Sequence, residues 1–187
     1  MEIKDLLKKD LMIMDLKATT KIEAIDEMVA KLKEKNIISD DAVFKDLILK
    51  REERSSTGLG EGIAMPHAKT SVVNTPTVLF ARSNKGIDYD ALDGEPVYIF
   101  FMIAASEDAH DLHIDTLAKL SKMLLNDDFT QGLKTCGTPD EVYTLIDKYS
   151  EKSQEAIKKE AKEVQNTNKK KILAVTACPT GIAHTYM

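Results

Sequence analysis

The sequence predicts an α/β protein, a three-layer α/β/α fold built around a mixed sheet of about five strands. Two patterns alternate along the 187 residues. Short apolar runs, the longest at residues 97–105, are typical of buried strands. Between these runs, apolar residues recur three and four positions apart, as they do on the buried face of a helix. Elements that alternate in this way favour helices packed on both faces of one sheet.

Two helices are expected early in the chain, after a first strand, or the approach to one, at residues 11–17. Thr20 and Glu23 have the spacing of a capping box, which predicts the start of a helix. Its expected buried face consists of Ile22, Ile25, Met28, Val29 and Leu32. The acidic pair at 40–41 is typical of a helix N-terminus, and this second helix is expected to end near residues 51–54. Its expected buried face consists of Val43, Phe44, Leu47 and Ile48.

Three more strands are expected in the middle of the chain. Residues 63–65 form a short apolar run, which the following proline ends because proline has no N–H for a strand ladder. Residues 77–82 and 97–105 form longer runs, with turns predicted at 84–86 and 93–96 between them. Neighbouring strands joined by turns favour antiparallel pairing.

The remainder of the first 150 residues is expected to be helical. An apolar helix begins near His110 and is broken by the acidic pair at 127–128, after which residues 129–133 form a short turn. Thr138 and Glu141 have capping-box spacing, with a proline at the first helical position. They predict a final helix.

The chain divides into three segments by composition. Residues 1–150 are long enough to bury a core and form one domain. Residues 151–170 are rich in Lys and Glu, which predicts a charged helical or flexible linker. Residues 171–187 begin with an apolar run that leads into a cysteine-headed loop, but they are too few to bury a core. We interpret them as the truncated start of a second domain.

Charge and composition exclude several classes of protein. The first 150 residues contain 19 basic and 27 acidic residues, a net charge of −8, whereas nucleic-acid binding requires a basic face. The longest apolar run has nine residues, too few for a membrane-spanning helix. Two cysteines provide no disulfide framework, and the N-terminus lacks a signal-peptide core. We therefore expect a cytoplasmic protein.

The strongest functional signal lies between Thr57 and His67. Three glycines alternate there, at Gly58, Gly60 and Gly62. Glycine lets backbone N–H groups approach an anion closely because no Cβ intervenes, and the Thr57 hydroxyl adds a donor. We predict a phosphate-binding loop beside a rigidly held imidazole, with His67 as a nucleophile that accepts a phosphoryl group. A structural histidine beside an ordinary tight turn is the alternative.

Two further histidines lie at the start of the helix that begins near residue 110. His110 and His113 are three positions apart, at a helix N-terminus where the dipole favours a nearby anion. A pair at this spacing also suits zinc, and a metal-dependent hydrolase using His67, His110 and His113 is an alternative function. No further Cys or His is placed to complete such a site, so we predict neither a metal nor a cofactor.

Cys178 heads the loop in the last segment. A thiol between a strand and a helix start is in a position where its pKa is lowered and phosphate binds. His184 occupies the place at which a tyrosine phosphatase has its arginine, which indicates a loop that holds phosphate on sulfur without hydrolysing it.

Together these two stretches resemble the phosphoenolpyruvate-dependent sugar phosphotransferase system. Residues 1–150 resemble its fructose/mannitol-type enzyme IIA domain, through Arg51, residues 57–67 and the helix that contains His113. Residues 171–187 resemble the start of a fructose-type enzyme IIB domain, with residues 177–184 as its active loop.

The resemblance implies a phosphoryl relay. The histidine-containing phosphocarrier protein HPr would phosphorylate His67, and the IIB thiolate, Cys178, would then take the phosphoryl group. A sugar entering through a membrane IIC domain would be the final acceptor, which implies membrane association through a full-length permease. By position, His113 matches the second active-site histidine of the family, Arg51 its arginine and Glu61 its acidic residue.

Two points remain open from the sequence. The sugar is expected to be fructose, with mannitol or a mannosyl derivative as alternatives. A regulatory module of the nitrogen-type IIA kind, which binds partner proteins according to its phosphorylation state, is the alternative function, although such a module needs no IIB segment.

Overall fold

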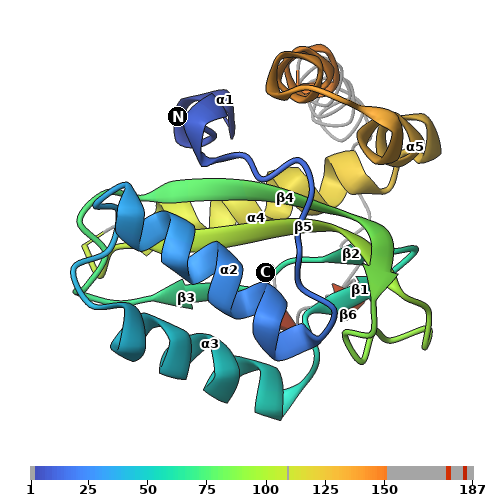
Figure 1. The fold of residues 1–187 in the computed structure, drawn as a ribbon. Helices are drawn as coiled ribbons and strands as arrows, with labels where there is room; N and C mark the ends of the chain where they lie inside the picture. Colours follow the sequence, from blue (N-terminus) through green and yellow to red (C-terminus); the bar gives the residue numbers. More distant parts are fainter. Residues whose placement is uncertain (1–2, 109, 151–175, 178–182, 185–187) are drawn as a thin grey trace, which may run out of the picture.

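The computed structural model describes residues 3–108, 110–150, 176–177 and 183–184 (Figure 1). It confirms the predicted fold class, because a mixed five-stranded sheet lies between layers of helices. The strands on one side of the sheet are short, whereas the central strand is long, and the candidate site lies on the side of the short strands.

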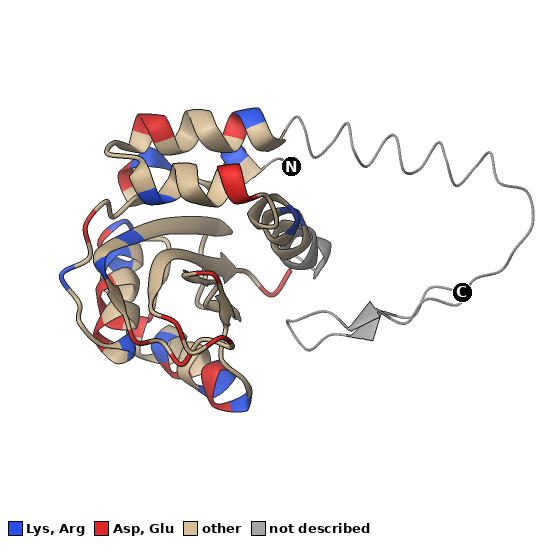
Figure 2. Cartoon of the chain, turned by 90° about the vertical axis from the view of Figure 1, so that its right-hand side faces the viewer, with Lys and Arg blue, Asp and Glu red and all other residues tan. Residues whose placement is uncertain are grey.

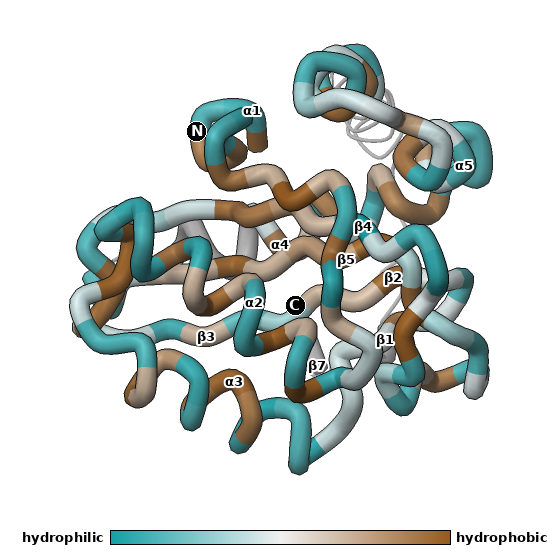
Figure 3. Tube along the Cα trace, viewed as in Figure 1, coloured by the Kyte–Doolittle hydropathy of each residue, from teal (hydrophilic) through white to brown (hydrophobic). Residues whose placement is uncertain are grey.

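The sheet is organised around β5 (Val97–Ala105). One edge of β5 pairs antiparallel with β4 (Thr77–Ile87), as predicted. Its other edge pairs in parallel with two short strands in succession, β2 (Ile63–Ala64) and β3 (His67–Lys69). A hairpin adds β1 (Gly58–Gly60), antiparallel to β2. Figure 3 shows that the central strands are largely hydrophobic along their length, which fits their burial on both faces.

One face of the sheet is covered by α2 (Lys21–Glu34) and α3 (Asp41–Arg54). The predicted capping box is present, since the Thr20 side chain accepts from the Glu23 N–H and the Glu23 side chain accepts from the Thr20 N–H. Asp40 caps α3 by accepting from the Val43 N–H at 3.0 Å. The core on this face includes Ile25, Met28, Leu32, Phe44 and Ile48.

The other face is covered by α1 (Ile3–Leu6), α4 (His110–Leu124), α5 (Asp127–Thr135) and a helix over residues 139–150. A 3-10 turn, Lys9–Leu11, joins α1 to the rest of the chain. A second core lies under these helices. Within it the rings of Phe80 and Phe101, from β4 and β5, meet edge to face with centroids 5.3 Å apart.

Several local predictions were wrong. The turn predicted at 84–86 is part of β4, which continues to Ile87 through a register shift that Gly86 accommodates with a φ of 78°. Residues 129–133 belong to α5, which Asn126 caps and in which the acidic pair at 127–128 occupies the first turn. Ile22 and Val43, expected on buried faces, are exposed.

The expected first strand at residues 11–17 is only an approach to the sheet. Ile13 forms an isolated parallel bridge with Ala81, and its N–H donates to the Phe80 carbonyl at 2.9 Å. The segment therefore lies alongside β4 without forming a regular strand.

In the last segment, β6 (Thr176–Ala177) and β7 (Ala183–His184) pair antiparallel. The expected linker at 151–170 and Cys178 lie outside the described residues, and the division into three segments stays a prediction. Within the described part of the chain, no helix combines the length and the apolar character needed to cross a membrane. Figure 2 shows that acidic and basic residues lie mainly on the helices and loops.

The capping box of α2 predicts a measurable stability contribution. Replacing the cap in Thr20→Ala removes the acceptor for the Glu23 N–H and is expected to lower the free energy of unfolding by about 1 kcal/mol. Urea denaturation of the full chain measures this. Thr75→Ala, which changes an exposed loop threonine, is the matched control and should leave the unfolding midpoint unchanged. Equal stability of both variants would show that the cap contributes nothing.

Candidate active site

The backbone fixes His67 at the start of β3. Pro66 interrupts the strand because it cannot donate a hydrogen bond, but its carbonyl accepts from the Ile103 N–H at 2.9 Å. His67 then pairs with Ile103 as the first residue of β3. The sequence predicted a position at a strand end. His67 in fact opens a second short strand on the same edge of β5.

The imidazole of His67 is held by a backbone carbonyl. Its Nδ1 lies 2.8 Å from the Met65 oxygen. A carbonyl can only accept, so Nδ1 must be the protonated nitrogen of the neutral ring. Nε2 then bears the lone pair, which is the condition for a nucleophilic imidazole.

The environment favours the neutral ring. Burial lowers the pKa of His67 below its ordinary value, and this effect is larger than the upward effect of the Met65 hydrogen bond. The positive charge of Arg51 lowers the pKa further, while the negative charge of Glu52 raises it. The ring is therefore a neutral base at physiological pH.

Arg51 approaches the site from the last turn of α3, which packs against β3. Its guanidinium donates to the Ser55 carbonyl at 2.9 Å and is close enough to His67 to affect its pKa. The charge of Arg51 thus acts on His67, while the active-site role that the resemblance implies for it stays a prediction. A guanidinium in this position suits the stabilisation of an anion on the imidazole.

Glu52 is a member of the site that the sequence analysis missed. It is 8% exposed and shares the buried face of α3 with Phe44 and Ile48. The signal was available, because positions 44, 48 and 52 are four residues apart and lie on one side of a helix. A carboxylate on such a stripe needs partners, since an unpaired buried charge is costly.

Thr57 lies between Glu52 and the segment that holds His67. Its N–H donates to Glu52 Oε2 at 3.0 Å, and its hydroxyl donates to Glu52 Oε1. Its carbonyl accepts from the Met65 N–H at 3.0 Å. Thr57 is buried and lies beside Met65, two residues from His67. The structure therefore places Thr57 beside the segment that holds the imidazole, but both of its donors bond to Glu52, which gives no support for the phosphate-binding role predicted for it.

The glycine stretch forms a hairpin that points away from His67. Residues 63 and 67 pair with 99 and 103, four residues apart along β5, which corresponds to about 13 Å. Gly60, Glu61 and Gly62 lie at the hairpin tip, beyond residue 63, with φ values of 99°, 55° and 79°. Gly58 lies in β1, opposite Ala64, where a Cβ would meet Ala91 at 2.8 Å. The structure does not bring Glu61 and the two tip glycines together with His67.

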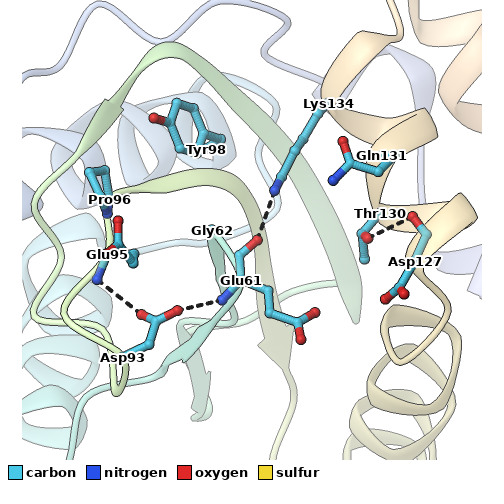
Figure 4. A pocket seen from close by; sticks show the side chains of 10 residues that line it. All are labelled: Glu61, Gly62, Asp93, Glu95, Pro96, Tyr98, Asp127, Thr130, Gln131 and Lys134. Carbon is cyan, nitrogen blue, oxygen red and sulfur yellow. Dashed lines mark hydrogen bonds between the residues drawn. The ribbon is translucent and has the colours of Figure 1, made fainter.

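The hairpin tip is tied to other loops, as Figure 4 shows. Asp93 accepts from the Glu61 N–H at 2.7 Å and from the Glu95 N–H at 3.1 Å. Both hydrogen bonds lower the pKa of the Asp93 carboxyl, and the bond from Glu95 has the larger effect. Lys134 donates to the Glu61 carbonyl at 2.9 Å. An open hollow of about 430 Å³ lies here, lined also by Tyr98 and Asp127. It is a separate place from the imidazole site.

Three other predicted site residues cannot be placed as side chains. His110 and His113 lie in the first turn of α4, but their side chains are outside the described part of the structure, as is Cys178. Among the side chains that are described, no group of three or more His, Cys, Asp or Glu residues is arranged to hold a metal ion. The proposed zinc set therefore stays untested.

Comparison with protein families identifies the domain. Residues 5–149 match the family described as "Phosphoenolpyruvate-dependent sugar phosphotransferase system, EIIA 2". The chain belongs to this family. It is thus a member of the EIIA-type phosphocarrier family of the sugar phosphotransferase system.

Relatives of this EIIA domain include both transport and regulatory proteins. The fructose-specific EIIABC component of Bacillus subtilis is 42% identical over 187 residues, which is all of this chain but 29% of that protein. The nitrogen regulatory protein IIA-Ntr of Neisseria meningitidis has a TM-score of 0.72 and 28% identity, over 77% of this chain and 98% of that one. The chain spans less than a third of the length of the fructose-specific relative.

A third relative was solved with a partner. The Escherichia coli enzyme IIA of the mannitol system, in a complex with phosphorylated enzyme IIB, has a TM-score of 0.65 and 25% identity, over 75% of this chain and 98% of that one. That mannitol-system IIA domain therefore has a known IIB-bound form.

The lowered pKa of His67 predicts a pH dependence of stability. Below pH about 6.5 the unfolded EIIA chain binds a proton at this residue, whereas the folded chain binds it only at a lower pH. The contribution of His67 to stability is therefore fully present above that pH and is lost as the pH falls through the native pKa. NMR titration of the ring protons measures the native pKa, and denaturation between pH 5 and 7.5 measures the slope.

The control for this prediction is His67→Gln, which cannot titrate. It should lose less stability than the wild-type chain over the same pH range. A native pKa of His67 at or above the ordinary histidine value would contradict the burial argument.

Proposed function

We propose that this EIIA domain accepts a phosphoryl group from HPr on Nε2 of His67 and passes it to the cysteine of an enzyme IIB domain. The main support is the hydrogen bond from Nδ1 to the Met65 carbonyl, which leaves the lone pair on Nε2. A half-buried ring with a lowered pKa is also a neutral nucleophile at physiological pH.

The transfer would proceed in two displacements at phosphorus. The Nε2 lone pair attacks the phosphorus held by HPr, and the bond from phosphorus to HPr breaks as the new N–P bond forms. The ring then has a proton on Nδ1 and a phosphoryl group on Nε2, and the Met65 carbonyl accommodates its positive charge. A thiolate of IIB attacks the same phosphorus next, and the bonding electrons return to Nε2. Positioning and electrostatic stabilisation supply most of the catalysis in such a reaction.

We assign supporting roles by proximity and by resemblance. Arg51 would neutralise the phosphoryl oxygens, since its positive charge acts on His67. His113 would be the second active-site histidine of the family, and Thr57 would hold the segment around Met65 in place. The roles predicted for Glu61, Gly58, Gly60 and Gly62 stay predictions, and their place in or near the hairpin gives no support for contact with a phosphoryl group on His67.

Fructose is the proposed sugar. The support is the 42% identity, over the entire 187 residues, to a protein named as fructose-specific EIIABC. A match of this length includes residues 171–187, which we propose to be the start of a IIB domain with Cys178 as its phosphocysteine. On this proposal the domain works at the cytoplasmic face of a permease with a membrane IIC domain. Mannitol or a mannosyl derivative is the alternative sugar.

Phosphorylation of the full chain tests the relay. With phosphoenolpyruvate, enzyme I and HPr, the wild-type chain is expected to acquire acid-labile, alkali-stable phosphate on residues 1–150. His67→Ala should lose this label completely, because it lacks the imidazole whose Nε2 is the proposed acceptor. Ser71→Ala, which removes an exposed hydroxyl four residues away, is the control and should label normally. Label retained on residues 1–150 of His67→Ala would end the proposal.

A regulatory function is the second candidate. The observation that favours it is the TM-score of 0.72 to IIA-Ntr of Neisseria meningitidis, and a nitrogen regulatory protein of Bradyrhizobium diazoefficiens is 32% identical over 78% of this chain. In this case the phosphoryl group on His67 would control binding to a partner protein.

The two functions differ in what the phosphorylated domain binds. Transfer from phosphorylated wild-type chain to a separately prepared fructose-type IIB domain, at a rate well above hydrolysis, is expected for the transport function. Failure of that transfer, together with capture of a non-transport partner whose binding depends on phosphorylation of His67, would instead support regulation.

A further inference from the structure

The inference concerns Glu52, a buried carboxylate that neither the resemblance nor the comparisons assign to the reaction. Four donors surround its two oxygens. These are the Thr57 N–H at 3.0 Å, the Thr57 hydroxyl, the Tyr89 hydroxyl at 3.1 Å and the Lys21 ammonium at 3.0 Å. A carboxylate with donors on both oxygens is fixed in position and orientation.

A chain of hydrogen bonds leads from Glu52 to the imidazole. The Glu52 carboxylate accepts hydrogen bonds from both the N–H and the hydroxyl of Thr57. The Thr57 carbonyl holds the Met65 N–H at 3.0 Å, and the Met65 carbonyl in turn lies 2.8 Å from Nδ1 of His67. Each step fixes the next backbone group, so the position of the Met65 oxygen depends on Glu52.

Charges of both signs lie near this chain of hydrogen bonds. Lys21, from α2, lies 4.7 Å above the Tyr89 ring and 3.6 Å from Asp90 as well as pairing with Glu52. Burial raises the pKa of Tyr89 well above its ordinary range, and the nearby negative charge of Glu52 is the second cause. The Tyr89 hydroxyl therefore keeps its proton and remains a donor. Among the described groups, the charges that act on His67 itself are those of Arg51 and Glu52, with opposite effects.

We propose that Glu52 is a positioning residue for the phosphoryl acceptor: by holding Thr57, and through it the Met65 carbonyl, it keeps the proton on Nδ1 of His67 and Nε2 aimed at the incoming phosphorus. This inference rests on the proposed function of His67. It assigns to Glu52 no contact with the phosphoryl group.

A purely structural role for Glu52 predicts something different. In that case the carboxylate only joins α2, α3 and the loop that contains Tyr89. Its loss would lower stability and remove the effect of its charge on the pKa of His67, but it would leave the ring proton on Nδ1 and the transfer rate unchanged. The test must therefore measure which nitrogen of the His67 ring carries the proton, because stability alone does not report this.

The experiment is an NMR titration of the full, unphosphorylated chain with nitrogen-15 in its histidine rings. Glu52→Gln keeps the shape of the side chain and removes its charge. It is expected to lower the pKa of His67, because the negative charge that raises it is removed, and to raise the fraction of the ring with its proton on Nε2. Arg51→Gln should shift the pKa in the opposite direction. Glu53→Gln changes an exposed carboxylate one residue along α3 and should change neither quantity.

Phosphoryl transfer gives the second readout. Glu52→Gln is expected to accept the phosphoryl group from HPr about tenfold more slowly than the wild-type chain at neutral pH, although its ring is more fully neutral, because Nε2 is less well aimed. Glu53→Gln should accept it at the wild-type rate.

Glu52→Asp keeps the proposal testable if Glu52→Gln does not fold. It preserves the charge opposite Lys21 but is one methylene shorter, so it cannot hold both donors of Thr57. The altered proton position and slower transfer should persist in this variant. A folded Glu52→Gln or Glu52→Asp variant whose ring proton stays on Nδ1 to the same extent as in the wild-type chain would overturn the inference. Because the titration needs no phosphoryl donor, this result is independent of whether the relay itself is found.

Discussion

The hydrogen bond between Nδ1 of His67 and the Met65 carbonyl determines which ring nitrogen carries the lone pair of a nucleophile. At 2.8 Å it assigns the proton to Nδ1 and the lone pair to Nε2. The bond exists because Pro66 turns the chain without releasing it from the sheet, since its carbonyl still bonds to Ile103. The donor ring and the acceptor carbonyl thus belong to neighbouring parts of one strand edge, fixed by β5.

The two cores supply the rigidity that this geometry needs. β5 is buried along nearly all of its length, between helices α2 and α3 on one face and α4, α5 and residues 139–150 on the other. Close-packed side chains on both faces leave little freedom for the strand that positions Ile103. The end of α3 then adds Arg51 and Glu52, whose opposite charges lie near the same imidazole. Burial keeps the ring neutral, and the arginine favours an anion beside it.

Local patterns in the sequence predicted much of this fold. The caps at Thr20 and Asp40 located two helices, and the apolar run at 97–105 located the central strand. These features depend on neighbouring residues, which is why they could be recognised. The continuation of β4 through residues 84–86 depends instead on a register shift against β5, which no local pattern contains.

The candidate site was only partly predictable for the same reason. His67, Arg51 and Thr57 were predicted as site residues. Thr57 bonds to Met65, two residues from His67, and the charge of Arg51 acts on the His67 ring. Glu61 was assigned to the site from the family resemblance, but the extended chain between residues 61 and 67 carries the two apart along the sheet. Glu52 was overlooked because it was taken as part of a charged helix end, although its spacing from Ile48 places it on the buried face.

The claim that Nε2 of His67 receives the phosphoryl group is tested most directly by phosphorus-31 and nitrogen-15 NMR of the phosphorylated full chain with labelled histidine rings. The structure predicts phosphorus bonded to Nε2 of His67, with the proton still on Nδ1. Phosphorus on Nδ1 of His67, or on another residue of the first 150, would contradict the account.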